Sequence, residues 1–233
     1  MKYALLSVAI VLTIIFIVVR IKKGGLLGLF TKTTASLAFV ATALVGAYSA
    51  GLKLVSLFVL LGLIFGLIGD IVLDLKIIYK SQQSQYLNAG MLSFGLGHIM
   101  YMVATILYSN NLFFKDINTF YIILVGFGFA GIVTVLIAIL AKPVLKIDFG
   151  NFKYQSLAYT FILSFMSAFS VIVGFFSPIF LIFALGIIFI FISDLILSLQ
   201  YFGGKQDSKL LTILNHAIYY IGQIAIAFSL FYI

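Results

Sequence analysis

The chain has 233 residues, of which 64% are hydrophobic and 9% are charged, whereas a soluble domain has roughly 45–50% and 25%. This composition excludes a soluble or disordered protein, and the lack of cysteine excludes disulfides and thiolate metal ligands. The net charge of +8 comes from lysines in short segments between apolar runs, a pattern typical of membrane-protein loops rather than of a nucleic-acid partner.

Eight apolar runs are long enough to cross a bilayer, which takes about 20 mainly apolar residues. The first run follows Lys2 and precedes Arg20, Lys22 and Lys23. A signal peptide has the opposite order of charges, so this run is interpreted as a retained helix. The predicted helices lie near residues 3–19, 33–50, 52–75, 87–109, 119–141, 154–174, 178–200 and 209–232. Together they predict an all-α, eight-helix transmembrane bundle that forms a single domain over residues 1–233.

The basic residues predict the orientation of this bundle. The loops after the first, third, fifth and seventh helices hold Arg20, Lys22, Lys23, Lys32, Lys76, Lys80, Lys142, Lys146, Lys153, Lys205 and Lys209. The opposite side holds only Lys2, Lys53 and Lys115. Since cytoplasmic loops are rich in lysine and arginine, the larger group is predicted to be cytoplasmic. Both termini are then outside.

Two segments of the chain resemble each other. The first runs from Asp70 to Tyr101 and the second from Asp194 to Tyr219. Each reads Asp-x-x-Leu-x-Leu after a small residue, then a polar loop, then His-x-x-Tyr. Both segments are predicted to cross the membrane in the same sense, so they suggest a parallel four-plus-four duplication. Chance similarity in an apolar chain is the alternative.

Two aspartates are predicted to lie inside the membrane at one depth. Asp70 and Asp194 are each roughly 9–10 Å from the cytoplasmic end of their helix, at about 1.5 Å per residue. A charge near the centre of a bilayer costs at least about 2.5–3.5 kcal/mol, so such groups normally face a bundle interior. Asp74 follows Asp70 by one helical turn. It either supports Asp70 or is an ordinary charge at the end of its helix.

Further polar side chains are expected near these aspartates. His98 and Tyr101 enter from the cytoplasmic side on the helix at 87–109. One face of the last predicted helix carries His216, Tyr219, Tyr220 and Gln223, at positions i, i+3, i+4 and i+7. These groups can build a two-carboxylate site, or they can simply hold helices together by hydrogen bonds. With two histidines a three-histidine zinc site is excluded, whereas a mixed His/Asp site stays open.

Six ordered motifs are spread over most of the chain. They are Phe-Thr-Lys-Thr at 30–33, Gly-x-x-Gly-Asp-x-x-Leu-Asp at 66–74, Phe-x-x-x-His-x-x-Tyr at 94–101, Tyr159 with Met166 and Ala168, Phe-x-x-x-Ser-Asp at 189–194, and Tyr-Tyr-x-x-Gln at 219–223. In this order they resemble the YhhN family, the membrane lysoplasmalogenases. Thr33 stands where the family usually has proline, and His216 does not belong to the family pattern.

This resemblance implies a hydrolase of a bacterial cell membrane that cleaves the vinyl ether bond of a lysoplasmalogen. The products are a fatty aldehyde and glycerophosphocholine or glycerophosphoethanolamine. A vinyl ether is hydrolysed by protonation on carbon, which produces an oxocarbenium ion that water then captures. Two carboxylates in a dry site can supply the proton and the counter-charge, because desolvation and mutual repulsion keep one of them protonated.

Asp70 and Asp194 are therefore the predicted catalytic pair. His98, Tyr101, Tyr220, Gln223 and Asp74 are predicted to support them, and Lys32, Lys76 and Lys209 at the cytoplasmic mouth are predicted to meet the lipid phosphate. The reaction requires no cofactor or metal, and the predicted partners are the lysophospholipid substrate and membrane lipids. A proton-coupled transporter that uses the same aspartates is the alternative function.

Overall fold

The computed structural model describes residues 1–112 and 119–233. Within them, eight helices are long and apolar enough to cross a membrane, which confirms the predicted all-α eight-helix architecture. The helices are α1 (Lys2–Lys22), α2 (Gly25–Ser49), α3 (Leu54–Ile78), α4 (Gln83–Leu112), α5 (Thr119–Leu140), α6 (Lys153–Phe176), α7 (Leu181–Phe202) and α8 (Lys209–Ser229). Short 3₁₀ turns precede α4, α6 and α7, at Lys80–Gln82, Gly150–Phe152 and Pro178–Phe180.

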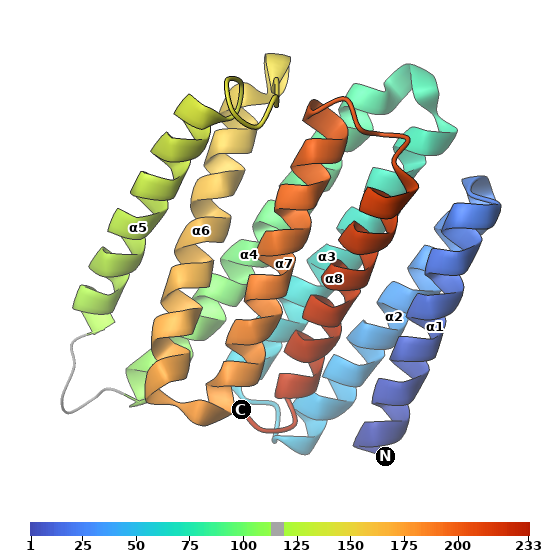
Figure 1. Cartoon of the computed structure of the whole chain (residues 1–233). Coiled ribbons are helices and arrows are strands. Elements are labelled where there is room, and N and C mark those ends of the chain that lie inside the picture. Colours follow the sequence, from blue (N-terminus) through green and yellow to red (C-terminus); the bar gives the residue numbers. More distant parts are fainter. Residues whose placement is uncertain (113–118) are drawn as a thin grey trace.

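Successive helices run in opposite directions, and both termini lie at one end of the bundle (Figure 1). The predicted cytoplasmic loops, including those around Lys80 and Lys205, lie at the other end. Helices α1 and α2 form one side and α5 and α6 the other, with α3, α7 and α8 between them. The orientation in the cell stays a prediction, and so does the duplication. Lys115 lies outside the described residues.

Helix α2 begins at Gly25 rather than near residue 33. Gly24 and Gly25 have φ values of 61° and 54°, which glycine adopts without the steric cost that other residues have. The chain therefore reverses directly after α1, and the apolar residues that follow become the first turns of α2. As a result Lys32 lies inside a helix and is buried, and its predicted place in a loop was wrong. Lys76 likewise belongs to α3 and is buried.

Glycines allow the closest helix crossings in the bundle. A Cβ added to Gly186 of α7 would lie 2.8 Å from the carbonyl oxygen of Gly222 of α8, and one added to Gly222 would lie 2.8 Å from the carbonyl oxygen of Gly186. The two backbones are therefore in direct contact, as is common where small residues face each other in membrane helices. This crossing brings Ser193 and Asn215 together, where the Asn215 amide donates 2.8 Å to the Ser193 carbonyl. It also places Asp194 beside the polar face of α8.

Candidate active site

A cavity of about 530 Å³ opens at the lysine-rich end of the bundle, within the range of about 300–1,000 Å³ that is usual for small-ligand sites. Asp70, Asp74 and Asp194 line its inner part, while the exposed Lys80 and Lys209 lie at its mouth. We call it the polar cavity. It brings Asp70 of α3 and Asp194 of α7 to one space, together with polar residues of α8.

Asp70 is buried at 2% exposure and is surrounded by three donors. Lys32 Nζ lies 3.1 Å from its Oδ1. Ser36 Oγ donates to its Oδ2 at 2.6 Å, and the Tyr219 hydroxyl donates to the same oxygen at 2.9 Å. These three donors, one of which is a cation, stabilise the negative charge of the Asp70 carboxylate.

Asp74 completes a group of ion pairs beside Asp70. Arg20 Nη2 contacts Asp74 Oδ2, and Lys32 Nζ lies 3.3 Å from Asp74 Oδ1. Asp74 is only 5% exposed, so its interpretation as an ordinary charge at a helix end was wrong. Two carboxylates face two cations here, and the group is charge-balanced. We refer to Arg20, Lys32, Asp70 and Asp74 as the ion cluster.

Asp194 has a different kind of environment. The Tyr159 hydroxyl donates to its Oδ2 at 2.5 Å, and His98 Nε2 lies 2.8 Å from the same hydroxyl. His98 Nε2 is also 3.7 Å from Asp194 Oδ2. Among the described residues no lysine or arginine forms an ion pair with Asp194. The three groups come from α4, α6 and α7, and Asp194 keeps 15% of its side chain exposed.

The other predicted support residues reach Asp70 indirectly. The Tyr101 hydroxyl donates to Gln223 Oε1 at 2.9 Å, and Gln223 Nε2 donates to the Tyr219 hydroxyl at 3.0 Å. Tyr219 in turn donates to Asp70. The Tyr220 hydroxyl lies 2.8 Å from Ser36 Oγ, the second donor to Asp70. Tyr101, Gln223 and Tyr220 therefore orient the groups that touch Asp70 and do not touch it themselves.

The three predicted phosphate lysines occupy very different places. Lys32 was expected at the mouth, but it is 3% exposed and is engaged by Asp70 and Asp74. Lys209 is exposed at the mouth. Lys76 lines the cavity at 5% exposure with its Nζ 3.0 Å above the centre of the Tyr201 ring. Within the described part of the chain, Lys76 Nζ has no hydrogen-bond partner.

Four residues that contact the aspartates directly were given no role in the predicted site: Arg20, Ser36, Tyr159 and Tyr219. Of these, Tyr219 was expected near the aspartates. Tyr159 and Tyr219 had a signal, since both lie in the ordered motifs. Arg20 was interpreted only as an orientation charge, and Ser36 follows no pattern. His216 lines the polar cavity and packs against Phe16 with ring centres 4.9 Å apart.

Residues 27–230 match the sequence profile of the YhhN family. The chain belongs to the YhhN family. No curated protein and no solved structure matches it. The match begins after α1, although α1 contributes Arg20 to the ion cluster of this YhhN protein. In the described residues of this YhhN protein, no group of three or more His, Cys, Asp or Glu is arranged to hold a metal ion.

Proposed function

We propose that this YhhN protein is a lysoplasmalogenase, an integral membrane hydrolase that cleaves the vinyl ether bond of a lysoplasmalogen. The observation that supports this most is the unequal surroundings of the two carboxylates in one cavity. Asp70 is held by a cation and two hydroxyl donors, whereas Asp194 meets only Tyr159 and His98 among the described residues. In the proposal Asp194 is the proton donor and Asp70 is the fixed negative charge.

The reaction begins when the Asp194 carboxylic acid gives its proton to the second carbon of the alkenyl chain. The positive charge that results is shared by the first carbon and the ether oxygen, and it is stabilised by the two carboxylates. Water then adds to the first carbon and loses a proton to the Asp194 carboxylate, which restores the acid. The hemiacetal then breaks its bond to the glycerol oxygen, which takes up the hemiacetal hydroxyl proton, and aldehyde and alcohol are released. Glycosidases use two carboxylates around a related cation, which is an analogy only.

His98 and Tyr159 position the acid in this proposal. The Tyr159 hydroxyl bridges His98 Nε2 and Asp194 Oδ2 with distances of 2.8 and 2.5 Å. These hydrogen bonds hold the Asp194 carboxyl group in one orientation in the cavity. The ion cluster fixes Asp70 from the other side, so neither carboxylate needs to move during the reaction.

The phosphate of the substrate is proposed to bind at Lys76, with Lys209 at the mouth. Lys76 is a buried lysine that lines the cavity, and its Nζ lacks a hydrogen-bond partner among the described residues. A buried ammonium group without a partner is costly, so an anion that entered the cavity would stabilise the charged form of Lys76. Lys32 is already engaged by two carboxylates and takes part in the proposal through Asp70.

Lys76→Met is expected to raise KM for lysoplasmalogen about 10-fold or more with a small change in kcat. A hydrogen bond to a charged group contributes roughly 1.5–3 kcal/mol, and 1.4 kcal/mol corresponds to about tenfold in affinity. The matched control is Lys205→Met, an exposed lysine at the same end that does not line the cavity. A 1-alkenylglycerol without phosphate should be cleaved equally well by Lys76→Met and wild type. An equal loss on both substrates would contradict phosphate binding at Lys76.

A proton-coupled transporter remains the second candidate. The hydrogen-bonded His98, Tyr159 and Asp194 favour it, because intramembrane carboxylates with such partners occur in proton relays. Purified protein in detergent, where no gradient exists, separates the two functions. Aldehyde release from lysoplasmalogen is the result we expect. No aldehyde, combined with substrate-dependent proton uptake into liposomes, would replace the hydrolase with the transporter.

A further inference from the structure

A second, smaller depression lies beside the polar cavity, among α4, α6 and α7. Its volume is about 50 Å³, and Leu87, Met91, Thr160 and Phe202 line it without lining the polar cavity. It shares Asp194 with the polar cavity, together with four apolar or aromatic neighbours, Leu73, Phe94, Leu197 and Tyr201. We call it the apolar groove. Asp194 is therefore the acidic group at the boundary between a polar and an apolar space.

We propose that the apolar groove is a lateral portal for the hydrocarbon chain of the lysolipid. The first methylene groups of the chain occupy the groove, and the rest of the chain stays among the lipids of the bilayer. This inference rests on the proposed function, because it identifies how the substrate of that site is held. The scissile bond joins a polar glycerol to an apolar chain, and it falls at Asp194 when each part lies in the space of matching polarity.

The size of the groove supports a portal rather than a pocket for a whole chain. A cavity needs roughly 10–15 Å³ to hold one water molecule, so 50 Å³ accommodates only a short run of methylene groups. The remainder of a long chain has to leave the protein. Placing this part of the chain in the bilayer costs no free energy, because the bilayer is as apolar as the side chains of the groove.

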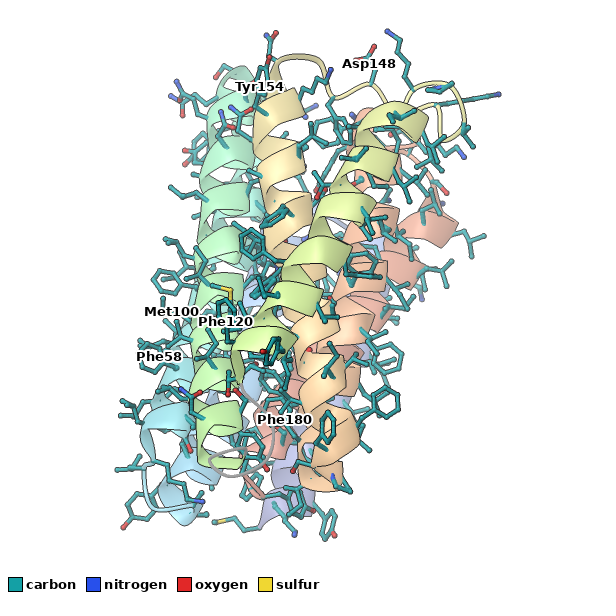
Figure 2. All side chains as sticks on the ribbon, turned by 90° about the vertical axis from the view of Figure 1, so that its left-hand side faces the viewer. Phe58, Met100, Phe120, Asp148, Tyr154 and Phe180 are labelled. Atoms are coloured by element: carbon teal, nitrogen blue, oxygen red, sulfur yellow. The ribbon has the colours of Figure 1, made fainter. Side chains whose placement is uncertain are left out.

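The position of α5 leaves this route open. Figure 2 shows α5 crossing obliquely in front of α6, so that it lies away from α4 toward the end marked by Asp148 and Tyr154. The groove is built from that half of α4 and α6, since Leu87 and Ser156 lie near the starts of these two helices. Leu87, Met91 and Thr160 in this half are only partly buried, so side chains of the groove reach the surface of the bundle.

The opposite side of the polar cavity is closed to a hydrocarbon chain. There the ion cluster connects α1, α2 and α3 through Arg20, Lys32 and Asp74. A chain that passed between these helices would separate buried ion pairs, and breaking such a pair costs about 3–5 kcal/mol. In the groove the Thr160 hydroxyl is bonded to the Ser156 carbonyl at 2.8 Å, so a chain displaces no ion pair there.

Photolabelling of the full-length wild-type protein tests the portal independently of turnover. The probe is an uncleavable 1-O-alkyl lysophosphocholine with a diazirine on the chain carbons next to the ether oxygen. We expect labels on α4, α6 and α7 near Met91, Thr160 and Leu197, and we expect excess unlabelled lysolipid to suppress them. A probe with the diazirine at the chain end should not label the groove. Labels on α1, α2 or α8, or groove labels that resist competition, would overturn the portal.

A substitution that fills the groove gives a second test. Thr160→Phe should lower kcat/KM for a long-chain lysoplasmalogen about 10-fold or more. Ala158→Phe is the matched control, because Ala158 is exposed on the same helix and does not line the groove. Ethenyl glycerophosphocholine, which has no chain to place in the groove, should lose much less activity with Thr160→Phe than the long-chain substrate does. Equal losses on both substrates would contradict the portal.

These outcomes separate the portal from the hydrolase function. Groove labelling without aldehyde release by the wild type would remove the lysoplasmalogenase proposal and leave a lysolipid-binding groove. Aldehyde release together with labelling on the side of the ion cluster would support the lysoplasmalogenase proposal and contradict the portal.

Discussion

Asp194→Asn is expected to reduce the turnover of lysoplasmalogen at least about 10²-fold while leaving the protein folded. General acid catalysis contributes roughly 10²–10⁴-fold, and an amide has no proton to donate to carbon. The asparagine carbonyl still accepts the hydrogen bond from Tyr159 that Asp194 accepts at 2.5 Å. Among the described residues no lysine or arginine is left unpaired by the change. Turnover should therefore fall with only a small change in thermal stability.

The measurement combines aldehyde release with thermal unfolding of the purified variant. Leu195→Ala is a suitable control, since Leu195 directly follows Asp194, is exposed and lines neither the polar cavity nor the apolar groove. A stable Asp194→Asn protein with near-normal aldehyde release would show that Asp194 holds helices together and has no catalytic role.

Asp70→Asn is expected to damage both activity and stability. The change leaves Arg20 and Lys32 facing Asp74 alone, and removing one partner from a buried ion pair costs about 3–5 kcal/mol. Activity should also fall at least about 10²-fold, because the fixed negative charge that faces the developing cation is lost. Both substitutions are thus expected to reduce activity, but only Asp70→Asn is expected to lower the stability of the protein strongly.

A second substitution separates these two effects. Lys32→Met in the Asp70→Asn background removes the excess cation and keeps much of the side-chain volume, so we expect most of the thermal stability to return while activity stays low. A double-mutant cycle measures this coupling. The control pair is Lys142 and Asp148. Their Nζ and Oδ2 atoms lie 3.0 Å apart, but their side chains are 80% and 63% exposed. That surface pair should show no measurable coupling. Recovery of activity in Asp70→Asn/Lys32→Met would contradict the role of Asp70.

The helical architecture could be predicted because hydropathy depends only on local composition. Each spanning helix has a long apolar run, and loop charges separate the runs from one another. The start of α2 could not be predicted in this way, since Lys32 resembled a loop charge. Its burial depends on Asp70 and Asp74, which come from another helix. A charge that is neutralised by a distant residue cannot be distinguished from a solvated one in a local window.

The functional site, like the helices, could be predicted only in part. Periodicity indicated that polar residues of α3, α4, α7 and α8 face one interior, and the structure brings them around one cavity. It did not indicate how they pair. Tyr159 comes between His98 and Asp194, and Ser36 comes between Tyr220 and Asp70. These contacts depend on the rotation of whole helices about their axes, which is determined by packing and not by any short motif.

Arg20 has a consequence for how the protein is made. It leaves the ribosome with α1, and its partner Asp74 follows 54 residues later. At about 5–20 residues per second, α1 spends roughly 3–11 s in the membrane before that partner exists. During this time the long side chain of Arg20, at the end of α1, extends to the lipid head groups. Insertion of α1 therefore precedes the formation of its ion pair with Asp74, which requires α3.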